Sequence, residues 1–131
     1  MKLFLTVALL FGASFSFAQS FVDEVVSNGE GSVASSDYFD VNSESGGKTV
    51  QLYVEAQASS EDGAWALAYF NSGSSVYAEA PYGARYIGGR YWDENFDSVN
   101  VAPWSTVTFS TNVVAYALPG EYARALIAGS W

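Results

Sequence analysis

The segment "KTVQLYVEAQA" (residues 48–58) has the clearest secondary-structure pattern in the chain and decides the fold class. Its apolar residues stand at every second position: Val50, Leu52, Val54 and Ala56. Polar or aromatic residues fill the positions between them. Because successive side chains of a strand point to opposite faces, this alternation predicts a β-strand with one face in a core and the other toward solvent.

Shorter segments of similar composition surround this strand, separated by glycine, serine, asparagine or proline. Further strands are expected at residues 20–27, 33–42, 64–70, 76–80, 84–92, 98–102, 105–111, 113–117 and 123–131. We expect residues 93–97 to form an acidic loop and Asn112 to bend the chain. Turn signals about every eight to twelve residues are typical of all-β domains. The sequence therefore predicts an all-β, single-domain, antiparallel Greek-key or jelly-roll-like β-sandwich of about seven to nine short strands.

Residues 1–18 have the pattern of a secretory signal peptide. Lys2 precedes an apolar run at 3–11, and Ser16 and Ala18 provide the small residues of a cleavage site. The apolar run is shorter than the ~20 residues that a membrane-spanning helix needs. We therefore expect a signal peptide at 1–18 and the β-sandwich domain at 19–131, with no membrane span. The mature protein is expected to be secreted. Its location would be extracellular, or periplasmic if the source is a Gram-negative bacterium.

The composition argues against nucleic-acid partners and excludes disulfide bonds. Five basic and 14 acidic residues give a formal net charge of −9. Nucleic acids bind to clustered Lys and Arg, so they are not expected as partners. The chain contains no cysteine. A secreted domain without disulfides must take its stability from aromatic and β-branched side chains in the core.

The sequence also lacks most catalytic side chains. Without His or Cys, the chain cannot form a Ser-His-Asp triad, a Cys-His pair or the usual zinc sites. Carboxylate pairs remain, and two of them can hydrolyse a glycoside. The candidates are Glu55 or Glu79 together with Asp93, Glu94 or Asp97. Strand carboxylates are usually solvated, so we expect no enzyme and no required cofactor.

Aromatic residues are concentrated in "YGARYIGGRYW" (82–92). Exposed rings stack on sugars or anchor protein partners. The predicted ligand-binding residues are Tyr82, Tyr86, Arg90, Tyr91 and Trp92. Burial in the core is the competing interpretation, and it is favoured for Tyr86 and Trp92 because aromatic residues are enriched in half-buried strands.

The acidic stretch that follows has the oxygen ligands that calcium prefers. Asp93, Asn95 and Asp97 are the predicted calcium ligands, with Glu94 and Ser98 between and beside them. A second, weaker candidate is Ser60, Glu61 and Asp62 in "SSEDG". A solvated acidic loop is the favoured alternative, because acidic residues are mostly exposed.

Two short motifs resemble known families. "ALPGEYARALI" (117–127) resembles the corner of immunoglobulin-like and fibronectin type III sandwiches, and the matching residues are Leu118, Pro119, Gly120 and Tyr122. The resemblance implies that the Tyr122 hydroxyl bonds to a backbone group upstream. "DENFDSVNV" followed by "STVTF" resembles the calcium loop and next strand of βγ-crystallin-type domains, although Glu94 and Asp97 depart from that pattern.

These observations favour a secreted, non-catalytic binding module that recognises an extracellular glycan or protein surface through exposed aromatic residues. One alternative is a structural or extracellular-matrix protein that self-associates through strand edges. Another is a calcium-stabilised domain like the βγ-crystallins, and a small carboxylate hydrolase is the third. Solvent exposure of the aromatic residues distinguishes the first from the others.

Overall fold

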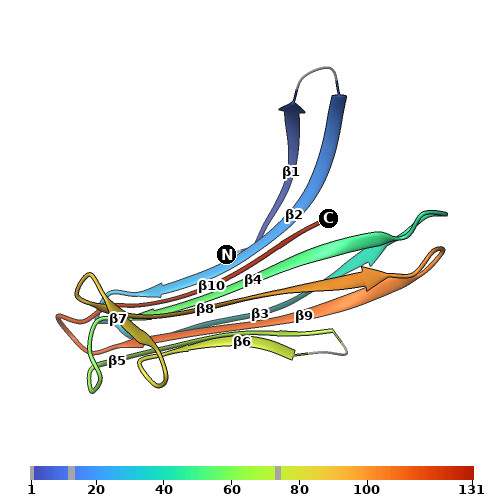
Figure 1. Cartoon of the computed structure of the whole chain (residues 1–131). Helices are drawn as coiled ribbons and strands as arrows, with labels where there is room; N and C mark the ends of the chain where they lie inside the picture. Colours follow the sequence, from blue (N-terminus) through green and yellow to red (C-terminus); the bar gives the residue numbers. More distant parts are fainter. Residues whose placement is uncertain (1, 12–13, 73–74) are drawn as a thin grey trace.

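The computed structural model describes the backbone of residues 2–11, 14–72 and 75–131, and the side chains of 19–72 and 75–131. Two antiparallel sheets pack face to face (Figure 1). The six-stranded sheet has the spatial order β1 (Lys2–Phe11), β2 (Ser14–Ser27), β10 (Ala123–Ser130), β4 (Lys48–Ala58), β8 (Arg90–Val101) and β7 (Arg85–Ile87). The four-stranded sheet has the order β3 (Gly31–Asn42), β9 (Thr106–Ala117), β5 (Ala64–Asn71) and β6 (Ser75–Ala80). The all-β sandwich is confirmed.

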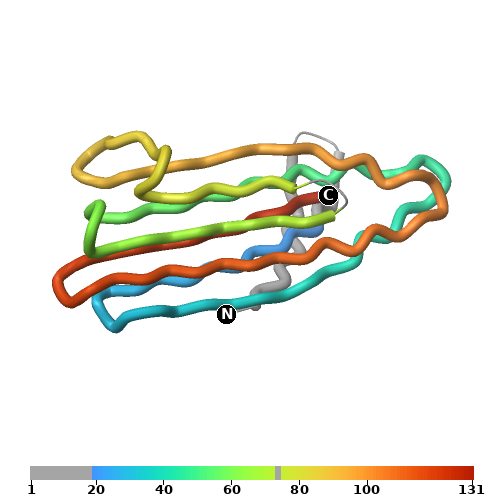
Figure 2. Tube along the Cα trace, turned by 90° about the horizontal axis from the view of Figure 1, so that it is seen from below, coloured from blue at the N-terminus to red at the C-terminus, as the bar shows by residue number. Residues whose placement is uncertain are grey.

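The strand order identifies the sandwich as a jelly roll. Leaving aside the flanking β1 and the short β7, the first strand pairs with the last, the second with the next to last, and so on inward: β2 with β10, β3 with β9, β4 with β8 and β5 with β6. A jelly roll is this rolled-up set of hairpins. Of the two strand orders that the sequence left open, the jelly roll is the one formed, and β10 lies between β2 and β4 (Figure 2).

Phe39 lies at the centre of the core. Its ring stacks on Phe21 at 4.6 Å between centroids, on Phe109 at 5.0 Å and on Trp131 at 5.1 Å, and meets Phe70 edge-on at 6.2 Å. The rings come from both sheets and from the residue that follows β10. Each buried ring contributes about 1.5–3 kcal/mol. Ring stacking thus takes the place of disulfide bonds in this chain.

Three sequence-based boundaries are wrong. Residues 93–97 are not a loop, because β8 runs without a break from Arg90 to Val101. Apart from the exposed Phe96, these residues are polar on both faces of the strand, so the segment lacks the apolar alternation of a half-buried strand. Asn112 does not bend the chain but lies within β9. Gly88 and Gly89 form a tight turn between β7 and β8, which divides the single strand expected at 84–92.

The predicted signal peptide coincides with β1 and the start of β2. The backbone of β1 pairs with residues 14–23 of β2, and Figure 1 shows this hairpin leaning away from the sandwich. Cleavage after residue 18 stays a prediction. Within the described ranges, no helix is long and apolar enough to cross a membrane.

Candidate functional site

The β7–β8 hairpin divides the predicted aromatic site between two surfaces. Its turn is made by Gly88 and Gly89, with φ angles of 62° and 83°. Only glycine adopts such angles at no steric cost, so the turn chemistry is already present in the sequence. Side chains then alternate along β8, so Tyr91 faces one way and Arg90 and Trp92 face the other.

Three tyrosines gather at one end of the sandwich. Tyr82 and Tyr86 are 69% and 64% exposed, and the Tyr86 ring lies 5.0 Å from the ring of Tyr91. Tyr82 and Tyr91 line a hollow of about 410 Å³ together with Glu61 and Asp62. We call these five residues the tyrosine end. The core location expected for Tyr86 is wrong, because β7 is a three-residue edge strand with every residue exposed.

The turn at residues 61–63 holds one of the tyrosines in place. The Tyr91 hydroxyl donates a hydrogen bond to Glu61 Oε1 at 3.0 Å. This hydrogen bond, with smaller contributions from burial and the Glu61 charge, raises the pKa of Tyr91 above its ordinary value. Glu61 and Asp62 were predicted only as a weak calcium candidate. They reach the tyrosines because β4 and β8 pair, which places the β4–β5 turn beside the β7–β8 hairpin.

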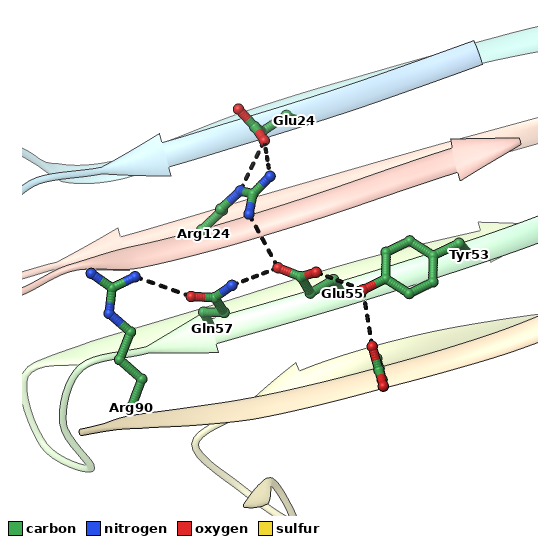
Figure 3. A network of polar contacts seen from close by, with 7 residues as sticks. Glu24, Tyr53, Glu55, Gln57, Arg90 and Arg124 are labelled. Atoms are coloured by element: carbon green, nitrogen blue, oxygen red, sulfur yellow. Dashed lines mark hydrogen bonds and ion pairs between the residues drawn. The ribbon is translucent and has the colours of Figure 1, made fainter. Parts of the chain in front are cut away.

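Arg90 and Trp92 lie on the outer face of the six-stranded sheet. The Arg90 guanidinium stacks 4.1 Å from the centroid of the Tyr122 ring. It also donates to Gln57 Oε1 at 3.1 Å (Figure 3). Trp92 lies opposite Gln57 and is half-buried on this outer face, not in the core as expected. The Tyr122 hydroxyl makes no hydrogen bond within the described residues, so its ring supports Arg90 instead of forming the predicted corner contact. Pro119 and Gly120 do form a turn before it.

A polar network connects four strands of this sheet (Figure 3). At its centre, the side chain of Glu55 is only 7% exposed. It accepts hydrogen bonds from the Tyr53 hydroxyl at 2.5 Å, Gln57 Nε2 at 2.6 Å and Arg124 Nη1 at 3.2 Å. Arg124 also binds Glu24 at 2.5 and 2.8 Å. Partial burial lowers the pKa of Arg124, but the hydrogen bond and charge of Glu24, with Glu55, outweigh it and raise that pKa.

The same network contains one of the carboxylate pairs that the sequence suggested for hydrolysis. Glu55 and Glu94 stand opposite each other on β4 and β8. Both accept from the Tyr53 hydroxyl, at 2.5 and 3.0 Å. Burial and these two hydrogen bonds raise the pKa of Tyr53 well above its ordinary value. Since Glu55 is buried and holds three donors, the pair has the features of a structural cross-link between strands.

The three predicted calcium ligands lie on the opposite face of β8, where two of them contact β6. Asp93 Oδ2 accepts from the Glu79 backbone N–H at 3.0 Å, and Asn95 Nδ2 donates to the Tyr77 carbonyl at 2.6 Å. Asp97 Oδ1 accepts from the Ser98 N–H at 2.8 Å. Side chains of β8 therefore cap backbone groups on β6, an edge strand. In the described part of the chain, no group of three or more acidic side chains is placed to hold a metal ion. Calcium binding stays a prediction.

Sequence reasoning missed a second hollow, on the outer face of the four-stranded sheet. It has a volume of about 410 Å³ and is lined mainly by β3, β9 and β5. Its residues come from three distant segments, so no contiguous sequence motif indicates this hollow. Only the strand register could have brought them together.

No protein-family model and no curated protein matches the chain. Among solved structures, that of the infectious bursal disease virus Gx strain matches with a TM-score of 0.43 and 10% identity, over 97% of this chain and 36% of the viral chain. TmCBM61 in complex with β-1,4-galactotriose matches with a TM-score of 0.34 and 14% identity, over 86% and 69% of the two chains. The carbohydrate-binding module CBM6cm-2 from Cellvibrio mixtus lichenase 5A in complex with cellotriose gives 0.26 and 13%, over 97% and 85%. At these identities and scores, the similarity does not identify a ligand for this chain.

Proposed function

We propose that the protein is a secreted, non-catalytic module that binds a neutral extracellular glycan at the tyrosine end. One observation carries the proposal: Tyr82 and Tyr91 line a hollow that also holds the Glu61 and Asp62 carboxylates, and the Tyr86 ring lies against Tyr91. Tyrosine rings stack on the C–H faces of sugars, while carboxylates accept hydrogen bonds from sugar hydroxyls. A concave site with apolar walls and a few polar groups is the usual form of a small-ligand site.

The charges around this end favour a neutral ligand over an anionic one. The chain has a formal net charge of −9. The two nearby cations are already engaged, Arg85 with Glu94 at 3.5 Å and Arg90 with Gln57 and the Tyr122 ring. An anionic glycan or a nucleic acid would meet Glu61 and Asp62 without a free cation to balance them.

The test is a titration of neutral hexasaccharides with the wild type and with the double variant Tyr82→Ala, Tyr86→Ala. Stacking of an aromatic ring contributes about 0.5–1.5 kcal/mol, so loss of two rings is expected to weaken binding about fivefold or more. Trp104→Ala is the matched control, because Trp104 is 77% exposed in the turn between β8 and β9. Equal affinity in both variants, measured by calorimetry, would reject the tyrosine end as the site.

A second candidate function is assembly through strand edges. The observation in its favour is β3, a 12-residue strand that forms one edge of the four-stranded sheet. Exposed edges pair with other chains, and lysine on an edge strand discourages this. If the protein assembles, sedimentation should show multimers that disappear in Ala34→Lys. A wild type that sediments as a monomer at high concentration rejects assembly.

A further inference from the structure

The hollow on the four-stranded sheet is built from two rows of side chains. In one row Tyr38, Ser110 and Asn71 stand opposite one another across β3, β9 and β5; in the next row Ser36, Asn112 and Tyr69 do so. We call these six residues the sheet hollow. The two tyrosines occupy diagonal corners of this array, and the hydroxyls and amides fill the positions between them.

Both rings of the sheet hollow reach solvent, and one of them is tethered. Tyr38 is 66% exposed, on the edge strand β3. Tyr69 is half-buried, and its hydroxyl lies 3.1 Å from Ser75 Oγ on β6. A sugar ring lying over Ser110 and Asn112 would therefore have an aromatic ring on either side. Tyrosine offers such contact area at a low cost in conformational entropy.

The polar side chains of the sheet hollow differ in their cross-strand hydrogen bonds from the neighbouring residues on the same strands. Further along β3 and β9, Thr108 donates to Asp40 at 2.5 Å and Thr106 donates to Asn42 at 2.6 Å. This cross-strand pairing is interrupted at Ser110, because the residue opposite it is Tyr38. Within the described residues, Ser110 Oγ has no hydrogen-bond partner.

Asn112 likewise keeps hydrogen-bonding capacity. Its Oδ1 accepts from Ser36 Oγ at 3.2 Å, which orients the amide. Among the described side chains and backbone groups, its Nδ2 has no acceptor. The sheet hollow thus presents an amide donor and a hydroxyl between two rings, and a ligand with hydroxyl groups can satisfy both.

The chemistry of the six side chains selects the class of ligand. All six are uncharged, and the one acidic residue at the hollow, Asp37, has a buried side chain. An ionic ligand would find no counter-charge, whereas a neutral sugar offers both apolar ring faces and hydroxyls. We infer that the sheet hollow is a second binding site for a neutral saccharide. It shares its ligand class with the proposed function, but it shares no residue with the tyrosine end.

Two separate sites would make the module bivalent. Binding of one glycan segment raises the effective concentration of another segment at the second site. The apparent affinity for a long polysaccharide that reaches both sites should then exceed the affinity of either site alone by about 10²-fold or more. Short oligosaccharides, which cannot bridge the sites, would bind at each site independently.

The experiment is a calorimetric titration with neutral cello-, xylo-, manno- and galacto-hexasaccharides, and with hexagalacturonate as the anionic probe. We expect two hexasaccharides per wild-type chain and one per chain in Tyr38→Ala. The variant Tyr82→Ala, Tyr86→Ala should also bind one, at the sheet hollow. Tyr116→Ala is the matched control, since Tyr116 is exposed on the same strand as Ser110 but outside the hollow.

Asn112→Ala provides an independent variant that keeps both rings. This variant should weaken binding at the sheet hollow by up to about tenfold, because it removes one hydrogen bond to a neutral ligand. Because the hollow is uncharged, 1 M NaCl should change its affinity less than about twofold. Thermal melts of each variant show whether it is folded.

The outcomes separate the two proposals. A single site that Tyr82→Ala, Tyr86→Ala abolishes and Tyr38→Ala leaves intact overturns the sheet hollow and supports the tyrosine end. A single site abolished by Tyr38→Ala alone does the reverse. Preference for hexagalacturonate, or no binding of any neutral probe, overturns both.

Discussion

The outer faces of the two sheets use polar side chains in opposite ways. On the six-stranded sheet, charged side chains are paired, and Arg124 binds both Glu24 and Glu55 (Figure 3). On the four-stranded sheet, the six side chains of the sheet hollow are uncharged, and among the described residues Ser110 Oγ and Asn112 Nδ2 have no partner. Polar groups that satisfy one another stabilise a fold, whereas groups that remain unsatisfied are available to a ligand.

Burial explains why the charged face must be paired. A carboxylate that is nearly inaccessible, such as Glu55, costs several kcal/mol unless donors surround it. A hydroxyl on an exposed face costs little when water satisfies it. The comparison therefore predicts that substitutions on the charged face reduce stability, and that substitutions on the neutral face reduce binding.

The largest effect should come from the core that supports both faces. Phe39→Ala removes a ring stacked on Phe21, Phe109 and Trp131, and it should lower the free energy of unfolding by about 3–5 kcal/mol. Urea denaturation measures this loss. Phe96→Ala is the control, because Phe96 is 71% exposed on the outer face and should cost less than about 1 kcal/mol. Similar midpoints for the two variants would mean that Phe39 is not the centre of the core.

A smaller effect tests the charged face directly. Arg124→Met keeps the length of the side chain but leaves the buried Glu55 without its cation, and it should cost about 1–3 kcal/mol. Asn112→Ala on the neutral face should change stability by less than about 0.5 kcal/mol. The same denaturation curves provide both numbers. If the two variants lose equal stability, the contrast between the faces does not hold.

The smallest effect concerns the hydroxyl that Glu55 and Glu94 share. Burial and these carboxylates raise the pKa of Tyr53. A raised pKa in the folded state gives stability that is fully present below pH ~10, the ordinary tyrosine pKa, and is lost as the pH rises toward the folded-state pKa. Tyr53→Phe should therefore cost about 0.5–1.5 kcal/mol at pH 8.

The pH dependence distinguishes this hydrogen bond from packing. The stability difference between the wild type and Tyr53→Phe should shrink between pH 10 and 11.5, because only the wild type loses the Tyr53 contribution there. Chemical denaturation at a series of pH values follows it. A difference that stays constant over this range would show that the hydroxyl does not stabilise the carboxylates.

The fold could be predicted because local alternation reports burial. The segment 48–58 was expected as a strand, and β4 has these bounds. The alternation failed at residues 93–97, where polar residues stand on both faces of β8 and the one apolar residue, Phe96, is exposed. There Asp93 contacts β6 and Glu94 joins the charged network, so neither face shows an apolar pattern. Strand order was left open because it depends on pairing between distant segments.

The candidate binding sites depend even more than the strand order on pairing between distant segments. The tyrosines at 82–91 are close in sequence, so their gathering at one end could be expected, although the alternation of β8 separates Arg90 and Trp92 from them. The sheet hollow requires the register of three strands at once. No property of one segment reveals it. Asn112 was even predicted to break the strand in which it faces outward.

The contacts of Asp93 and Asn95 with β6 also restrict how copies of this chain can meet. The Glu79 N–H and the Tyr77 carbonyl already have intramolecular partners, so an incoming strand finds them occupied. Sheet extension on that layer would then proceed from β3. If only the β3 edge can pair, the β3 strands of two molecules pair with each other about a twofold axis and no further edge of that sheet is open. The result is a closed dimer instead of a fibre.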